Sequence, residues 1–148
     1  MSRAVVLDAG TLGMLTHPRR KVNRPVADWC RRCLLTEVTL VVPEIADYEV
    51  RRELIRARKP KSVARLDALA KAILYLPITT PTMREAARLW ADLRNQGLPT
   101  ADDKALDADV ILAAQARSPQ DQYDEVVIAT DNVGHLDRMA AAKRWSDL

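Results

Sequence analysis

Short apolar runs alternate with longer stretches of helical periodicity along this chain. Three runs are apolar throughout and rich in β-branched residues, at Ala4–Leu7, Thr39–Val42 and Val126–Ala129, and a weaker fourth lies at Ile73–Ile78. Continuous hydrophobicity, rather than alternation, is typical of strands that are covered on both faces. The pattern therefore predicts a central parallel sheet of four to five strands.

Helical periodicity fills the segments between and after these strands. This alternation predicts an α/β fold, in which helices cover both faces of the sheet as a three-layer α/β/α sandwich. No linker divides the chain, so we expect residues 1–148 to form a single domain. Thr100 and Asp103 resemble a capping box that opens the fifth helix. The six predicted helices span Val22–Leu35, Pro43–Arg58, Ser62–Ala72, Pro81–Gln96, Asp103–Arg117 and Val133–Lys143.

The composition is that of a globular protein rather than a fibre, a disordered chain or a membrane protein. Of 148 residues, 48% are hydrophobic and 29% are charged. No apolar stretch approaches the roughly 18 residues of a membrane span, and the N-terminus shows no secretory signal. Cys30 and Cys33 form an isolated C-x-x-C, too few ligands for a tetrahedral zinc site. We therefore expect a cytoplasmic protein with reduced thiols and no membrane partner.

Charge is distributed unevenly along the chain. Residues 1–74 carry 15 basic and 8 acidic side chains, whereas residues 75–148 carry 8 and 12. One basic face and one acidic focus would suit a polyanion bound near a cation site. Two ordinary solvated surfaces would give the same counts. The aromatic content of 4%, without Phe, argues against an aromatic platform for stacking bases.

Acidic residues are found where the predicted strands end and on the helices that follow them. Asp8 ends the first strand and Asp131 follows the run at Val126–Ala129, and ligands of open parallel sheets bind at this edge. Asp109 lies within the apolar stripe of its helix, where a carboxylate is costly unless it is paired or bound to a cation. Glu49 flanks the inward face of the helix after the second strand. Salt bridges or backbone hydrogen bonds could instead satisfy Asp109 and Glu49.

Together, these four carboxylates are predicted to converge on one edge of the sheet. Four such groups need a counter-charge, and Mg²⁺, with its preference for oxygen ligands and water, suits a site that handles phosphate. A bound divalent cation can activate water for hydrolysis. His17 and His135 stand in no Ser-His-Asp arrangement, and we interpret both as surface or packing residues.

A basic segment follows Glu49. Residues 51–65 hold seven basic side chains and one acidic one. Arg51, Arg52 and Arg56 begin this segment, and a guanidinium can hold two phosphate oxygens at once. A solvated helix end, with cations near its C-terminus, is the alternative interpretation.

Four short motifs, in order, resemble the PIN domain, the small metal-dependent ribonuclease fold that includes the VapC toxins of bacterial toxin–antitoxin modules. VVLDAG resembles the opening strand with its first metal-binding Asp, at Asp8. PEIADYEVRREL resembles the segment with the family's Glu, at Glu49, and DADVILAAQA the helix with the third acid, at Asp109. VVIATDNVGHL resembles the closing segment, which here carries Asn132 where many members have Asp. Asp131 is the substitute for that fourth acid, or Asn132 itself ligates the metal.

The resemblance implies an endoribonuclease that uses Mg²⁺ or Mn²⁺ to hydrolyse RNA phosphodiester bonds. It also implies catalytic roles for Asp8, Glu49, Asp109 and Asp131. In the toxin members a small antitoxin protein covers the cleft, and homodimers are common. The RNA target is not implied, because the loops that select it vary within the family.

Three other functions compete with the toxin interpretation. LDAGTL resembles the D-x-D-G-T of haloacid-dehalogenase-like phosphatases, but the required second Asp, two residues from Asp8, is missing. A stand-alone RNA-processing nuclease of the PIN type would carry the same residues. A PIN-like module that binds RNA or protein without cleavage would lack acids, whereas Asp8, Glu49 and Asp109 are present.

Overall fold

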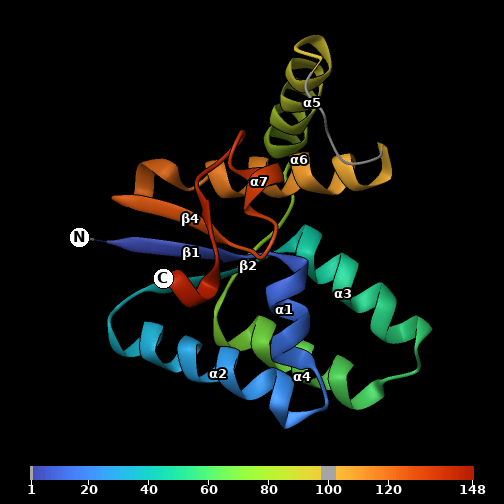
Figure 1. Cartoon of the computed structure of the whole chain (residues 1–148), viewed down its shortest axis with the longest axis vertical. Coiled ribbons are helices and arrows are strands. Elements are labelled where there is room, and N and C mark those ends of the chain that lie inside the picture. Colours follow the sequence, from blue (N-terminus) through green and yellow to red (C-terminus); the bar gives the residue numbers. More distant parts are fainter. Residues whose placement is uncertain (1, 98–102) are drawn as a thin grey trace.

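A parallel five-stranded sheet forms the centre of the molecule (Figure 1). The structure is a computed structural model that describes residues 2–97 and 103–148, and of residues 103–105 it describes the backbone alone. The strand order within these ranges is β3-β2-β1-β4-β5, so β1 is central. The strands are β1 (Arg3–Leu7), β2 (Thr39–Pro43), β3 (Leu74–Leu76), β4 (Glu125–Ala129) and β5 (Ala142–Lys143). The predicted parallel sheet is confirmed.

Helices cover both faces of this sheet, as the predicted three-layer sandwich requires (Figure 1). In the view of Figure 1, α5, α6 and α7 lie above the strands, and α1, α2 and α4 lie below them. The described helices are α1 (Ala9–Thr16), α2 (Arg20–Leu35), α3 (Glu44–Arg56), α4 (Pro60–Ala72), α5 (Thr80–Asn95), α6 (Asp103–Arg117) and α7 (Val133–Leu136), with short 3-10 turns η1 (Gln120–Gln122) and η2 (Trp145–Asp147).

The central strand shows why the apolar runs are continuous. Ala4 and Val6 belong to the hydrophobic core on the α5–α6 side, while Val5 and Leu7 belong to the core on the α1–α2 side. All four side chains are at most 1% exposed. Because successive side chains of a strand point to opposite faces, a strand covered on both faces needs an apolar residue at every position.

Two elements differ from the predicted ones. Residues Val133–Lys143 were expected to form one helix, but the helix ends at Leu136 and Ala142–Lys143 form β5. The backbone of β4 decides this, since the Ile128 N–H donates to the Ala141 carbonyl at 2.8 Å and the Thr130 N–H to that of Lys143 at 2.9 Å. Pairing with a free sheet edge thus overrides the helix propensity of this alanine-rich segment.

Helix α1 was missed because its sequence, AGTLGMLT, holds two glycines. Asp8 caps its N-terminus, and buried Leu12 packs it against the sheet. Pro43, expected in the first turn of the next helix, is instead the last residue of β2 and the N-cap of α3. Of the capping box expected at Thr100 and Asp103, Thr100 and the side chain of Asp103 lie outside the described residues.

A buried glutamine fixes the position of α6. Gln115 is 0% exposed; its Oε1 accepts a hydrogen bond from the Ile45 N–H at 3.1 Å, and its Nε2 donates to the Leu76 carbonyl at 2.8 Å. The side chain therefore joins α6 to the start of α3 and to the end of β3. This sets the register of the helix that carries Asp109.

The sequence also led to expectations about the two cysteines and about membrane spans. Cys30 and Cys33 are free and buried in α2, and burial raises the pKa of Cys30 to about 12. Such a thiol is a poor nucleophile at neutral pH. No helix within the described ranges is long and apolar enough to cross a membrane.

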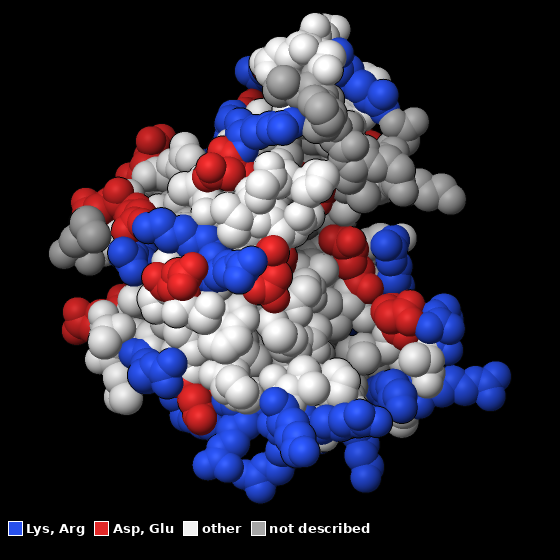
Figure 2. All heavy atoms as spheres, in the orientation of Figure 1, with Lys and Arg blue, Asp and Glu red and all other residues white. Residues whose placement is uncertain are grey.

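The charge asymmetry of the sequence is visible on the surface. In Figure 2, Lys and Arg side chains gather along the lower edge, over α2 and α4 of Figure 1, whereas Asp and Glu lie across the middle and upper parts of this face. The lower edge is thus mainly basic, while basic and acidic side chains are mixed over the rest of this face.

Candidate active site

Asp8 stands at the carboxyl end of the central strand and caps the following helix. Its Oδ1 accepts a hydrogen bond from the Thr11 N–H at 2.7 Å, as an Asp at the N-cap commonly does. The Thr11 hydroxyl donates to the carbonyl of Ala129 at 3.0 Å, which ties the start of α1 to the end of β4. The strand end and the cap therefore fix the direction of the carboxylate, and only one of its oxygens is used by the cap.

Glu49 lies on α3 and Asp109 lies on α6, and the charge of Asp8 acts on both. Burial raises the pKa of Glu49, and Asp109 and Asp8 raise it further, while Arg52 opposes them. Burial also raises the pKa of Asp109, with an added contribution from Asp8 and an opposing one from His135. Each acid is half-buried. The structure therefore places three of the four predicted acids in one region, where like charges destabilise one another.

Asp131 and Asn132 are less closely tied to this group. Both are exposed, and Asp131 is not among the charges that shift the pKa of Glu49 or Asp109. The backbone N–H of Asn132 donates to the Thr130 hydroxyl at 2.9 Å, and Thr130 itself is 0% exposed. The turn is therefore fixed at Thr130, while the roles of Asp131 and Asn132 as ligands stay predictions.

The acidic group suits a hard divalent cation that keeps much of its water. Among residues 2–97 and 103–148, no cluster of three or more His, Cys, Asp or Glu side chains is compact enough to hold a metal ion. The three acids thus share a region without forming a closed ligand shell. Carboxylate oxygens that repel one another fit Mg²⁺, which usually takes one or two carboxylates and several waters. Zinc, with its preference for nitrogen and sulfur ligands, fits poorly.

The three arginines predicted to bind RNA have different environments. Arg51 donates to Asp47 at 2.9 Å and to Asp67 at 2.7 Å, and so links α3 to α4. Asp47 is 8% exposed and also accepts a hydrogen bond from the Tyr75 hydroxyl at 2.7 Å. The structure therefore gives Arg51 a structural role, and contact with RNA stays a prediction for it.

Arg52 and Arg56 of α3 are both exposed. Arg52 lies 4.0 Å from Glu49 and 4.9 Å from the centre of the Tyr48 ring. Arg56 is paired with Glu53 in the last turn of the helix. Ion pairs this exposed are weak, so both guanidinium groups can exchange these partners for phosphate at little cost.

Because of these environments, substitution of Arg51 and substitution of Arg52 together with Arg56 are expected to change different properties of the protein. Arg51→Ala is expected to lower the free energy of unfolding by about 1–2 kcal/mol, because it leaves the buried Asp47 carboxylate with fewer donors. The double variant Arg52→Ala, Arg56→Ala is expected to keep its stability, to weaken RNA binding and to flatten its salt dependence. Urea unfolding and RNA binding titrations at several salt concentrations measure both effects. If the RNA affinity of the double variant depends on salt concentration as steeply as that of the wild type, the role of these residues in RNA binding is contradicted.

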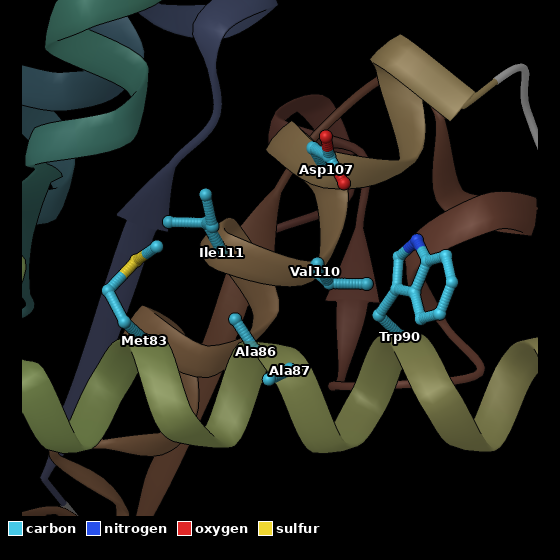
Figure 3. A pocket seen from close by; sticks show the side chains of 7 residues that line it. All are labelled: Met83, Ala86, Ala87, Trp90, Asp107, Val110 and Ile111. Carbon is cyan, nitrogen blue, oxygen red and sulfur yellow. The ribbon is translucent and has the colours of Figure 1, made fainter.

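A cavity of about 400 Å³ adjoins the acids between α1 and α3, and Glu49 is part of its lining. Another, also about 400 Å³, lies between α5 and α6, where Figure 3 shows Met83 and Trp90 projecting from α5 beside Val110 and Ile111 of α6. Among the described residues that line it, the one carboxylate is Asp107, and the others are apolar. The acidic region, where three carboxylates come together, is therefore the candidate active site.

Sequence reasoning missed several residues that build the site. Thr11 and Thr130 hold the ends of β1 and β4, and Gln115 holds α6. The only sequence signal for Thr11 was its place three residues after Asp8, which is the spacing of an N-cap hydrogen bond. His135, interpreted as a surface or packing residue, is exposed as expected but close enough to Asp109 to lower the pKa of that carboxyl.

Comparison with known proteins supports this fold over nearly the whole chain. No family model and no curated protein matches the sequence. Among solved structures, a chain of VapBC2 from Rickettsia felis, bound to a DNA fragment from its promoter, has a TM-score of 0.75 at 14% identity and covers 96% of this chain and 98% of its own.

Two further structures agree. VapBC-1 from nontypeable Haemophilus influenzae gives a TM-score of 0.66 at 18% identity, with 97% and 98% of the two chains covered. DNA-bound VapBC from Salmonella typhimurium gives 0.64 at 20% identity, with 98% and 99% covered. The resemblance to VapC-like PIN domains is thereby confirmed at the level of the fold, a three-layer α/β/α sandwich. Identities this low show the fold and not the activity.

Proposed function

We propose that the protein is a metal-dependent endoribonuclease and the toxin of a type II toxin–antitoxin module. The observation that carries this proposal is the convergence of Asp8, Glu49 and Asp109, from three separate elements, at the carboxyl edge of a parallel sheet. Ligand sites of such sheets lie at this edge. The fold shared with chains of VapBC complexes supports the same proposal.

Asp8, Glu49 and Asp109 are the residues that would hold Mg²⁺ or Mn²⁺, with Asp131 or Asn132 as a further oxygen donor. The bound ion would activate water and neutralise charge on the phosphate. The chain's own contribution is to fix these oxygens in advance, through the Thr11 N–H at Asp8 and through the register that Gln115 gives to α6. Arg52 and Arg56 would then bind the flanking phosphates of the RNA.

A small antitoxin protein is the proposed partner, and a homodimer is the proposed assembly. The solved structures of this fold are described as VapBC complexes, two of them bound to DNA. Light scattering of the protein, alone and after co-expression with the product of a small neighbouring reading frame, measures both the assembly and the complex. A monomer that forms no complex would contradict these two proposals without affecting the proposed nuclease.

Divalent metal ions are expected both to activate RNA cleavage and to stabilise the folded protein. Adding Mg²⁺ or Mn²⁺ to the metal-free protein should produce RNA cleavage and raise the Tm by a few degrees, because the cation relieves repulsion among the acids. A chelator should reverse both effects. Cleavage of a mixed RNA pool and thermal unfolding measure them, and Ca²⁺ at equal concentration tests for ionic specificity. RNA binding without cleavage under any metal condition would contradict the nuclease and indicate an RNA-binding module.

A further inference from the structure

The cavity between α1 and α3 opens directly beside the acidic region. Glu49 contributes to both, and Gly10, on the α1 side of the cavity, stands next to the Asp8 carboxylate. A Cβ built at Gly10 would lie 3.6 Å from Asp8 Oδ1. Any ligand in this cavity therefore lies beside the catalytic carboxylates rather than at a separate place on the surface.

Two of the four α1 residues that line the cavity are glycines, Gly10 and Gly13, and the second of them weakens the helix. Gly13 lies in the interior of α1, where glycine is destabilising relative to alanine. A Cβ at Gly13 would meet no heavy atom within 4 Å, so packing does not require glycine there. Because Gly13 lines the cavity, the space left by its missing side chain is part of the cavity itself. The fold gains nothing from this space, whereas a ligand would.

The opposite wall indicates the chemistry of that ligand. Val50 and Leu54 of α3 give it an aliphatic surface, and Glu49 and Glu53 add carboxylates. These carboxylates disfavour a phosphate inside the cavity but accept hydrogen bonds from the N–H groups of a base. Arg52 also lines the cavity and is exposed, so its guanidinium is available to a phosphate outside. The walls therefore suit an uncharged hydrogen-bond donor, such as a nucleobase, with its phosphates at the rim.

We propose that this cavity binds one nucleobase of a single-stranded RNA, next to the phosphate that is cleaved; the inference rests on the proposed function. A volume of about 400 Å³ is near the lower end for ligand pockets, about 300–1,000 Å³, and suits a single nucleotide. Only an unpaired base can leave its stack and enter such a pocket.

Filling the cavity from Gly13 tests this proposal. In Gly13→Leu, the rate of RNA cleavage, divided by the rate of cleavage of an oligomer of the same length built from abasic ribose phosphates, is expected to fall by at least about tenfold, because the abasic oligomer has no base to lose from the cavity. Gly13→Ala should also lower this ratio and should raise the Tm. It is the variant that tests the proposal if Gly13→Leu does not fold. Ala64→Leu, which adds a leucine to the exposed face of α4, is the matched control.

The outcomes separate this inference from the proposed function. Wild-type protein that hydrolyses neither substrate with metal would overturn both. Wild-type cleavage with an unchanged ratio in both Gly13 variants would overturn the base pocket and leave the nuclease intact. Equal loss of both rates would also overturn it, since the added side chain would then be disturbing the carboxylates. A fall in the ratio for the Gly13 variants but not for Ala64→Leu supports it.

Discussion

Asp109→Asn is expected to lower metal-dependent RNA cleavage by about 100- to 1,000-fold while the protein stays folded. The substitution keeps the volume of the side chain but removes a charge that a cation in this site would need. The same change should raise the Tm of the metal-free protein at neutral pH, because burial and Asp8 make the charged form of Asp109 unfavourable in the folded state. Loss of activity with a gain in stability separates a functional acid from a structural one.

The pH dependence of this gain follows from the direction of the pKa shift. The pKa of Asp109 is raised above its ordinary value of 3.8, so the charged side chain weakens the fold above the raised pKa. The gain from Asp109→Asn should therefore be largest at neutral pH and disappear below pH 3.8. Asp8→Asn should abolish cleavage as well, and Asp107→Asn, on the exposed side of α6, is the matched control. Full cleavage by both Asp8→Asn and Asp109→Asn would exclude the proposed site.

Gln115→Leu is expected to cause the largest loss of stability among these substitutions, about 2–5 kcal/mol. Leucine is close to glutamine in size, but it leaves the Ile45 N–H and the Leu76 carbonyl without their partner. Each unpaired group in the interior costs free energy, and no alternative partner is provided by an apolar side chain. Urea unfolding measures the change, with equal m-values showing that the denatured states are comparable.

The loss in Gln115→Leu should extend to the active site. Asp109 lies on the same helix, so a looser α6 should weaken the stabilisation of the protein by Mg²⁺ as well as its cleavage of RNA. Gln122→Leu, at an exposed position, is the matched control and should lie within about 0.5 kcal/mol of the wild type. A Gln115→Leu variant as stable as this control would show that water or a rearranged backbone satisfies the two groups.

Much of the fold could be predicted because its signals are local. Runs such as Ala4–Leu7 report burial on both faces, and this suffices for a parallel sheet with helices on each side. Asp8 was found because it ends a strand, and Asp109 because it interrupts an apolar stripe. The structure brings both into one region with Glu49, which the pattern of α3 indicated less strongly.

Other features had no local signal. The alanine-rich segment before Lys143 has a helical composition, and only the exposed backbone of β4 makes it a strand. Arg51 and Arg52 are neighbouring residues of the same type. In the structure, however, Arg51 pairs with Asp67 of the next helix, whereas Arg52 lies beside Glu49. The two glycines of α1 argued against a helix there. That they line a cavity could not be predicted, because α3 forms the opposite wall.

The sequence by itself determined the layers of this protein and indicated Asp8 and Asp109 as candidate acids, because burial on two faces, the end of a strand and an acid within an apolar stripe are each read from neighbouring residues. Tertiary structure alone decided the strand β5, the structural use of Arg51, the anchoring by Gln115 and the cavity beside Asp8. Each of these depends on a hydrogen bond, a charge or a wall contributed from a distant part of the chain, and such pairings form only when the elements pack.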